Sequence, residues 1–185
     1  MTVRAPFGWW PTGPNGKRWS WALGAATVAL SIVLGVLEQQ LKDAGASIVD
    51  FELARTFNRS FEIITGWAEA GRIGTAKTSV LVDFPYLVLY GLTLAAAATG
   101  LGRRLTERRY QPAGRWGLGV AWAAVVAALL DAAENVCLWL QLTGGPRRIY
   151  ALPAVVFATA KFVVLAVVIA YLVVGGLASL RDRRA

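Results

Sequence analysis

Residues 116–142 read WGLGVAWAAVVAALLDAAENVCLWLQL, and they are the most informative stretch of the chain. The run is long enough to cross a bilayer as an α-helix, which takes about 20 apolar residues. It nevertheless carries Asp131, Glu134 and Asn135 among its apolar side chains. Ionisable groups cost roughly 2.5–3.5 kcal/mol each at the centre of a membrane helix, so they persist where they pair, meet water or do work. We therefore expect a membrane helix whose polar face points into a bundle.

Three further segments are long and apolar enough to span a membrane, namely residues 19–38, 78–101 and 150–177. The composition agrees, because 56% of the 185 residues are hydrophobic and only 16% are charged. A mean hydropathy of +0.51 is typical of membrane proteins. The sequence predicts an all-α fold, a polytopic membrane protein with a four-helix transmembrane bundle that forms a single domain over residues 19–177.

The basic residues predict the orientation of this bundle. The short connection between the second and third spans, Gly102–Arg115, is rich in arginine, and basic loops stay on the cytoplasmic side. Both termini then face the cytoplasm, as an N-terminal segment over residues 1–18 and a basic tail over residues 178–185. Abundant alanine and an excess of arginine over lysine suggest a bacterial chain, so we expect the cytoplasmic (inner) membrane of a bacterium.

The long connection between the first two spans is expected to be helical. Its apolar residues recur at helical spacing and form one stripe, which consists of Leu53, Phe57, Phe61, Ile64 and Ala68. Ser47 and Asp50 stand where an N-cap and a capping acid belong, and Gly71 can end the helix. We predict one amphipathic helix over residues 48–70 that lies in the outer interface and packs on the bundle. A lid over a site that opens outward is the alternative.

The intramembrane polar residues are predicted to meet. Asp131, Glu134 and Asn135 share one face of their helix, and the rise of about 1.5 Å per residue puts Lys161 of the next span at the same depth. Asp83 lies near the outer end of the second span, and Glu38 closes the first span on the same side. The predicted site is a polar funnel that Tyr86 and Tyr90 also line; its residues are Asp83, Tyr86, Tyr90, Asp131, Glu134, Asn135 and Lys161.

Three functions stay open for this cluster, and whether the protein is an enzyme is open with them. The first is structural or accessory, with an ion pair that orients two helices or holds a partner membrane subunit. The second is proton- or cation-linked binding or transport by a homo-oligomer. The third is a lipid- or isoprenoid-modifying enzyme, for which Asp131, Glu134 and Lys161 are the candidate catalytic residues. Three acids against one lysine leave a carboxylate to be protonated, hydrated or matched by an external cation.

The residue inventory excludes several site classes. The sequence contains no histidine, and Cys137 is its single cysteine. Zinc sites of the His/Cys type and nucleophile systems that need histidine are therefore excluded within one chain. We expect no metal and no cofactor, although the oxygens of Asp83, Asp131 and Glu134 could hold a hard cation. The formal charge of +8 comes from basic residues that flank apolar runs, so we expect membrane lipids as partners and no nucleic acid.

Small residues at four-residue intervals predict close contacts between helices, as is usual in membranes. They form three series: Thr27, Ser31 and Gly35; Gly91, Ala95 and Thr99; and Gly119, Ala123 and Ala127.

Several short motifs together resemble a family of small bacterial integral membrane proteins with no established activity. The resemblance covers roughly Phe51–Tyr171, and the motifs are Trp67-Ala-Glu-Ala-Gly71, Val82-Asp83-Phe84 with Tyr90, Asp131-Ala-Ala-Glu134-Asn135, and Lys161-Phe162. It implies a four-helix membrane protein and supports the choice of site residues. It implies no activity.

Overall fold

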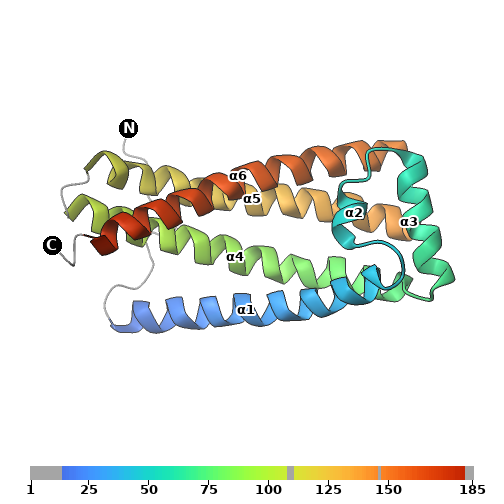
Figure 1. Ribbon diagram of the computed structural model, residues 1–185, viewed down its shortest axis with the longest axis horizontal. Helices are drawn as coiled ribbons and strands as arrows, with labels where there is room; N and C mark the ends of the chain where they lie inside the picture. Colours follow the sequence, from blue (N-terminus) through green and yellow to red (C-terminus); the bar gives the residue numbers. More distant parts are fainter. Residues whose placement is uncertain (1–13, 108–110, 146, 182–185) are drawn as a thin grey trace.

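The computed structural model describes residues 14–107, 111–145 and 147–181, and within these ranges all regular structure is helical. Figure 1 shows four long helices that run side by side, with two short helices gathered at one end of the bundle. The elements are α1 (Pro14–Lys42), α2 (Ile48–Glu52), α3 (Phe57–Glu69), α4 (Ile73–Glu107), α5 (Gln111–Gly144) and α6 (Arg148–Arg181). Of the predicted terminal segments, residues 1–13 and 182–185 lie outside the described residues.

The four predicted spans are confirmed as α1, α4, α5 and α6, each long and apolar enough to cross a membrane. The chain is therefore a multi-pass membrane protein. Each helix continues beyond the predicted span at both ends, so that α1 already begins at Pro14 and α6 runs to Arg181. These extensions follow from backbone hydrogen bonding, which does not stop where the apolar run stops.

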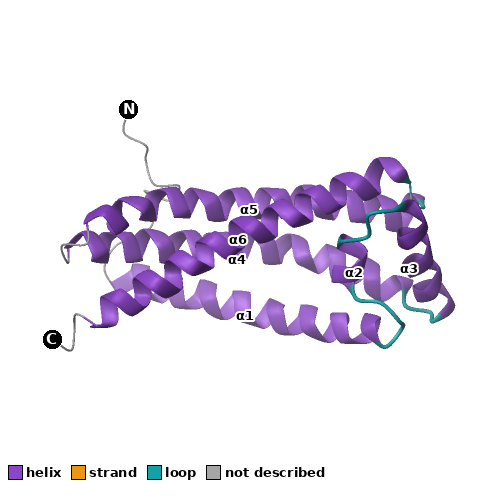
Figure 2. Ribbon diagram, turned by 45° about the horizontal axis from the view of Figure 1, so that its top comes forward, coloured by secondary structure: helices purple, strands orange, loops and turns teal. Residues whose placement is uncertain are grey.

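The bundle is packed unevenly. α5 lies against both α4 and α6, whereas α1 packs mainly against α4 and stands away from the other long helices. Figure 2 shows the same arrangement from a turned view. The centre of the bundle is built from small side chains, among them Ala95, Ala98, Ala121 and Ala124, which are fully buried. Most of the apolar surface of α1 is exposed, as expected of a helix that faces lipid.

The closest approach between long helices involves glycines that the small-residue series did not single out. A Cβ added at Gly117 would lie 2.7 Å from the Cα of Gly102 and 2.9 Å from the hydroxyl of Tyr171. Gly91 is confirmed as a contact, because a Cβ there would lie 2.9 Å from the Cβ of Ala128. The prediction for Gly119 is wrong, since its Cβ position has no atom within 4 Å. Four-residue spacing identifies a face but not the member of it that meets the neighbouring backbone.

This contrast supplies a matched pair of variants. Gly117→Ala is expected to force α4 and α5 apart and to cost about 1–3 kcal/mol of unfolding free energy. Gly119→Ala, two residues away, is expected to change it by less than about 1 kcal/mol. Unfolding in mixed micelles, followed by tryptophan fluorescence, measures both. Equal stability of the two variants would contradict the close approach at Gly117.

The connection between α1 and α4 differs from its prediction as one helix over residues 48–70. It contains two helices, because Ser47 caps α2 and Thr56 caps α3; each side chain accepts a hydrogen bond from the backbone N–H of the third residue of its helix. The expected capping box between Ser47 and Asp50 is confirmed. Gly71 has a φ of +68° just past the end of α3, which confirms its terminating role.

Of the predicted apolar stripe on this connection, Ile64 packs against the buried core, but most of the stripe does not. Leu53, Phe57 and Phe61 are exposed, while the buried face of α3 consists of Ser60, Ile63 and Trp67. The Trp67 indole N–H donates to the Ala46 carbonyl at 3.0 Å and fixes α3 over the bundle end. Helical periodicity identifies an apolar face but not what covers it, so the stripe alone did not distinguish the two faces of α3.

Candidate functional site

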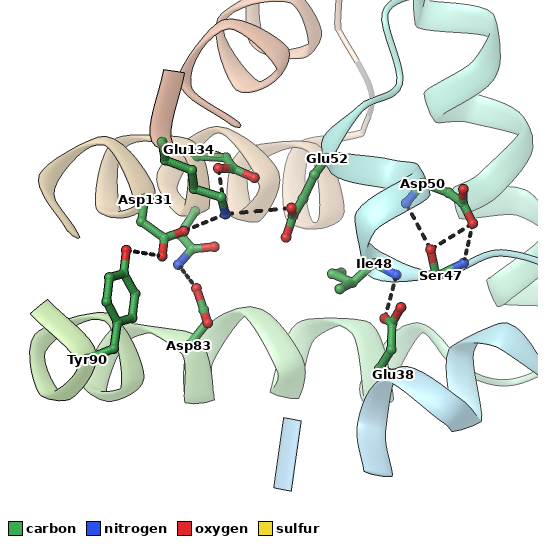
Figure 3. Close-up of polar contacts among 11 residues, drawn as sticks. Glu38, Ser47, Ile48, Asp50, Glu52, Asp83, Tyr90, Asp131 and Glu134 are labelled. Atoms are coloured by element: carbon green, nitrogen blue, oxygen red, sulfur yellow. Dashed lines mark hydrogen bonds and ion pairs between the residues drawn. The ribbon is translucent and has the colours of Figure 1, made fainter. Parts of the chain in front are cut away.

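A buried ammonium group lies at the centre of the polar cluster. Lys161 of α6 places its Nζ 2.7 Å from Asp131 and 2.8 Å from Glu134, both on α5. It also lies 3.6 Å from Glu52, which ends the short helix α2. Figure 3 shows these side chains converging from three separate elements. The prediction that Lys161 is level with the two acids of α5 is confirmed.

The cluster is shielded from solvent by the protein itself. Lys161 is 6% exposed, Asp131 is 4% exposed and Glu134 is fully buried. An ammonium group has three N–H donors, and three carboxylates surround it here. A charge in such surroundings is tolerated only when it is paired and hydrogen-bonded, so this cluster specifies how α2, α5 and α6 are arranged.

The remaining predicted residues join the cluster through hydrogen bonds. Tyr90 of α4 donates its hydroxyl to Asp131 at 2.8 Å, and the Asn135 amide donates to Asp83 at 2.6 Å. Tyr86 lies next to Tyr90, with ring centroids 5.3 Å apart, and its hydroxyl is 3.3 Å from that of Ser31 on α1. The structure thus brings all seven predicted site residues into one region between the helices.

Glu52 is the member of the site that sequence reasoning missed. It belongs to the segment that the sequence predicts as one interfacial helix over residues 48–70, but it is 9% exposed and points into the bundle. Ser47 and Thr56 could have indicated this arrangement from the sequence, because two N-cap residues nine positions apart imply two short helices in place of one long helix. A residue at the end of the first helix is then free to turn inward.

Glu38 is predicted at the mouth of the funnel. In the structure its carboxylate is occupied by two partners from the protein. Its carboxylate accepts from the backbone N–H of Ile48 at 2.9 Å and pairs with Lys42 at 3.4 Å. Glu38 therefore attaches the start of α2 to α1. Together with Glu52 at the other end, it holds α2 over the cluster (Figure 3).

The electrostatic surroundings of Glu52 are unusual for a residue outside the spans. Burial is the largest cause that raises the pKa of Glu52 to about 7; the carboxylates of Asp131 and Asp83 act in the same direction, and Lys161 opposes them. One ammonium group therefore does not neutralise the acids around it. The site carries an excess of negative charge that a proton or another cation can balance.

Two cavities adjoin the cluster. The larger has a volume of about 420 Å³ and extends between α1, α4 and α6; the smaller, of about 240 Å³, lies between α1, α2 and α4. Glu52, Asp83 and Val49 line both cavities. Asp131, Tyr86, Tyr90 and Lys161 line only the larger one, whose remaining wall includes Leu94, Leu165 and Ile169. The larger cavity thus has one acidic end and one apolar end.

Within residues 14–107, 111–145 and 147–181, no group of three or more His, Cys, Asp or Glu side chains is placed to hold a metal ion. Asp131 uses one oxygen for Lys161 and the other for Tyr90, and Asp83 accepts from Asn135. These contacts occupy oxygens of Asp83 and Asp131, two of the three carboxylates that the sequence suggested for a hard cation.

No family model, curated protein or solved structure matches this chain. The resemblance to small bacterial membrane proteins therefore stays a prediction from short motifs. The function has to be argued from the site itself.

Proposed function

We propose that this membrane protein binds an amphipathic cation in the larger cavity. The cavity volume of about 420 Å³ falls in the range of small-molecule sites, and its wall combines an apolar stretch with a few polar groups at one end. The polar end is acidic, since Glu52, Asp83 and Asp131 line it and Lys161 is the only base among its lining residues. A ligand with a positive head and an apolar body matches both ends.

The observation that carries the proposal is the state of Asp83. Lys161 is in ion-pair contact with Glu52, Asp131 and Glu134, but no such contact joins Asp83 to a basic group within the described residues. Its one hydrogen bond from a side chain is neutral, from the Asn135 amide. A carboxylate that lines two cavities without a counter-ion attracts a cation from outside the protein.

The route to the site runs through the membrane. α1 and α6 both line the larger cavity but do not pack closely on each other, because α1 lies mainly against α4. A molecule dissolved in the lipid can reach the cavity sideways between these helices. The arginine-rich connection between α4 and α5 supports a cytoplasmic location for the opposite end of the bundle, so that the ligand enters from the outer half of the bilayer.

Binding of dodecylamine, compared with dodecanol, tests this proposal on the purified protein in lipid nanodiscs. Both molecules have the same apolar tail and partition into the lipid. A difference in their affinity for the protein therefore reports the positive charge of the amine. We expect dodecylamine to bind at least about tenfold more tightly and Asp83→Asn to remove most of that preference. Asp43→Asn, which changes an exposed acid, is the control. Equal binding of amine and alcohol would overturn the proposal.

A purely structural function is the second candidate, and the saturation of Lys161 favours it. The three contacts of its ammonium group connect α6 with α5 and α2, as an interhelical lock requires. The combined variant Lys161→Met, Asp131→Asn, Glu134→Gln tests whether these three side chains take part in binding. A folded variant that keeps its affinity for dodecylamine would show that they serve the architecture only, whereas an unchanged protein without a preference for dodecylamine over dodecanol would leave the structural function alone.

A further inference from the structure

Two of the three acids at the acidic end of the larger cavity come from elements that differ in their attachment to the bundle. Asp83 belongs to the long span α4, whereas Glu52 belongs to α2, which has five residues. Both side chains line both cavities, and Figure 3 shows them extending toward the same region from opposite sides. Their carboxylates are close enough for the charge of Asp83 to influence Glu52.

These two carboxylates keep acceptor capacity that the other acids have used. Asp131 has one oxygen with Lys161 and the other with Tyr90, and fully buried Glu134 lines neither cavity. Glu52 is nine-tenths buried, and the ammonium group of Lys161, at 3.6 Å, is too distant for a strong hydrogen bond. Apart from a side-chain hydrogen bond shared with Glu134, its oxygens accept from no amide, amine or hydroxyl of a described residue. A buried carboxylate in this state favours a ligand that brings N–H donors.

The same contacts exclude an anionic group from the ligand. Among the residues that the structure describes, Lys161 is the only base that lines either cavity, and its three donors already face carboxylates. A phosphate at this end would meet Glu52, Asp83 and Asp131 without a base to bind it. Like charges at such short range cost several kcal/mol.

The aromatic residues do not form a cage for a quaternary ammonium ion. Such a cage surrounds the cation with ring faces. Here Tyr86 and Tyr90 come from one helix and their rings face each other at 57°, while the Phe162 ring lies 5.1 Å from the Lys161 ammonium. The acidic end is therefore built for hydrogen bonds and not for enclosure by rings.

We propose that the ligand is an alkyl amine with N–H donors and without a phosphate, held between Glu52 and Asp83. This inference rests on the proposed function and names its ligand class. α2 supplies half of the recognition, so the site is complete only when α2 lies in place. The alkyl chain follows Leu94, Leu165 and Ile169 along the apolar end of the cavity.

The test compares three ligands on the unchanged protein in nanodiscs at pH 8. They are dodecylamine, dodecyltrimethylammonium and a phosphatidylethanolamine with short chains, each measured by equilibrium binding. We expect dodecylamine to bind at least about tenfold more tightly than the other two, because only it offers N–H donors without a phosphate. No variant has to fold for this comparison.

Two variants then locate the site. Glu52→Gln and Asp83→Asn are each expected to weaken dodecylamine binding about tenfold or more, whereas Glu69→Gln, which changes an exposed acid near the end of α3, leaves it unchanged. Equal binding of dodecylamine and dodecyltrimethylammonium would overturn the inference and leave the proposed function standing. A loss of preference over dodecanol would overturn both. Unchanged affinity in a folded Glu52→Gln variant would remove α2 from the site.

Discussion

Replacing Lys161 by methionine is expected to destabilise the protein by about 3–5 kcal/mol. The change removes the only base from a cluster of three carboxyl groups that are 9% exposed or less. Breaking a buried ion pair by removing one partner leaves charges without compensation, and costs of this size are typical. The free energy of unfolding, measured in mixed micelles by tryptophan fluorescence, gives the magnitude.

Two further variants make this result specific to the cluster. Lys42→Met removes an ammonium group that is about half exposed and pairs with Glu38, so we expect a change of less than about 1 kcal/mol. Adding Glu52→Gln, Asp131→Asn and Glu134→Gln to Lys161→Met removes the charges that lost their partner. That combination should recover a large part of the lost stability. A Lys161→Met protein as stable as Lys42→Met would contradict the arrangement in Figure 3.

Dodecylamine binding is expected to weaken steeply as the pH falls from 8 to 6. The amine stays protonated over this range, because alkyl ammonium groups titrate near pH 10. Burial raises the pKa of Glu52 to about 7, among the neighbouring groups Lys161, Asp131, Glu134 and Asp83. Below this pH a proton occupies the carboxylate that the ligand needs, so the affinity falls by up to about tenfold per pH unit. Titration calorimetry at several pH values measures it.

The protein without ligand should respond in the opposite direction. Because the pKa of Glu52 in place is about 7 and above its ordinary value of 4.5, the docked α2 holds a proton more tightly than a released α2. The contribution of this group to stability is present at low pH and is lost as the pH rises from 4.5 through 7. Glu52→Gln should weaken both pH dependences, and an unchanged profile in this variant would assign them to other residues.

The four spans were predictable because their signal is local. A run of about 20 apolar residues crosses a bilayer whatever it packs against, and residues 78–101, 116–142 and 150–177 lie within α4, α5 and α6. Helical periodicity also placed Asp131, Glu134 and Asn135 on one face. Equal depth then sufficed to match them with Lys161, because neighbouring antiparallel helices bring equal depths together.

The assignment of Glu52 failed because its environment is not local. An apolar stripe at helical spacing can contact either lipid or protein. Leu53, Phe57 and Phe61 therefore predicted the wrong face of the connection as the buried one. The inward direction of Glu52 depends on the break between α2 and α3 and on Lys161, more than a hundred positions later in the chain. The helical periodicity of the connection therefore carries no information about Lys161.

The sequence by itself determined that the chain crosses the membrane four times and that acids and one amine meet inside it. Tertiary structure alone decided which glycine forms the α4–α5 contact, which acid comes from α2, and that Asp83 lines a cavity while Lys161 pairs with the other acids. The physical reason is the distance along the chain over which each interaction acts. Hydrophobic transfer and helix geometry act on each segment separately, whereas ion pairing and close packing depend on which segments become neighbours.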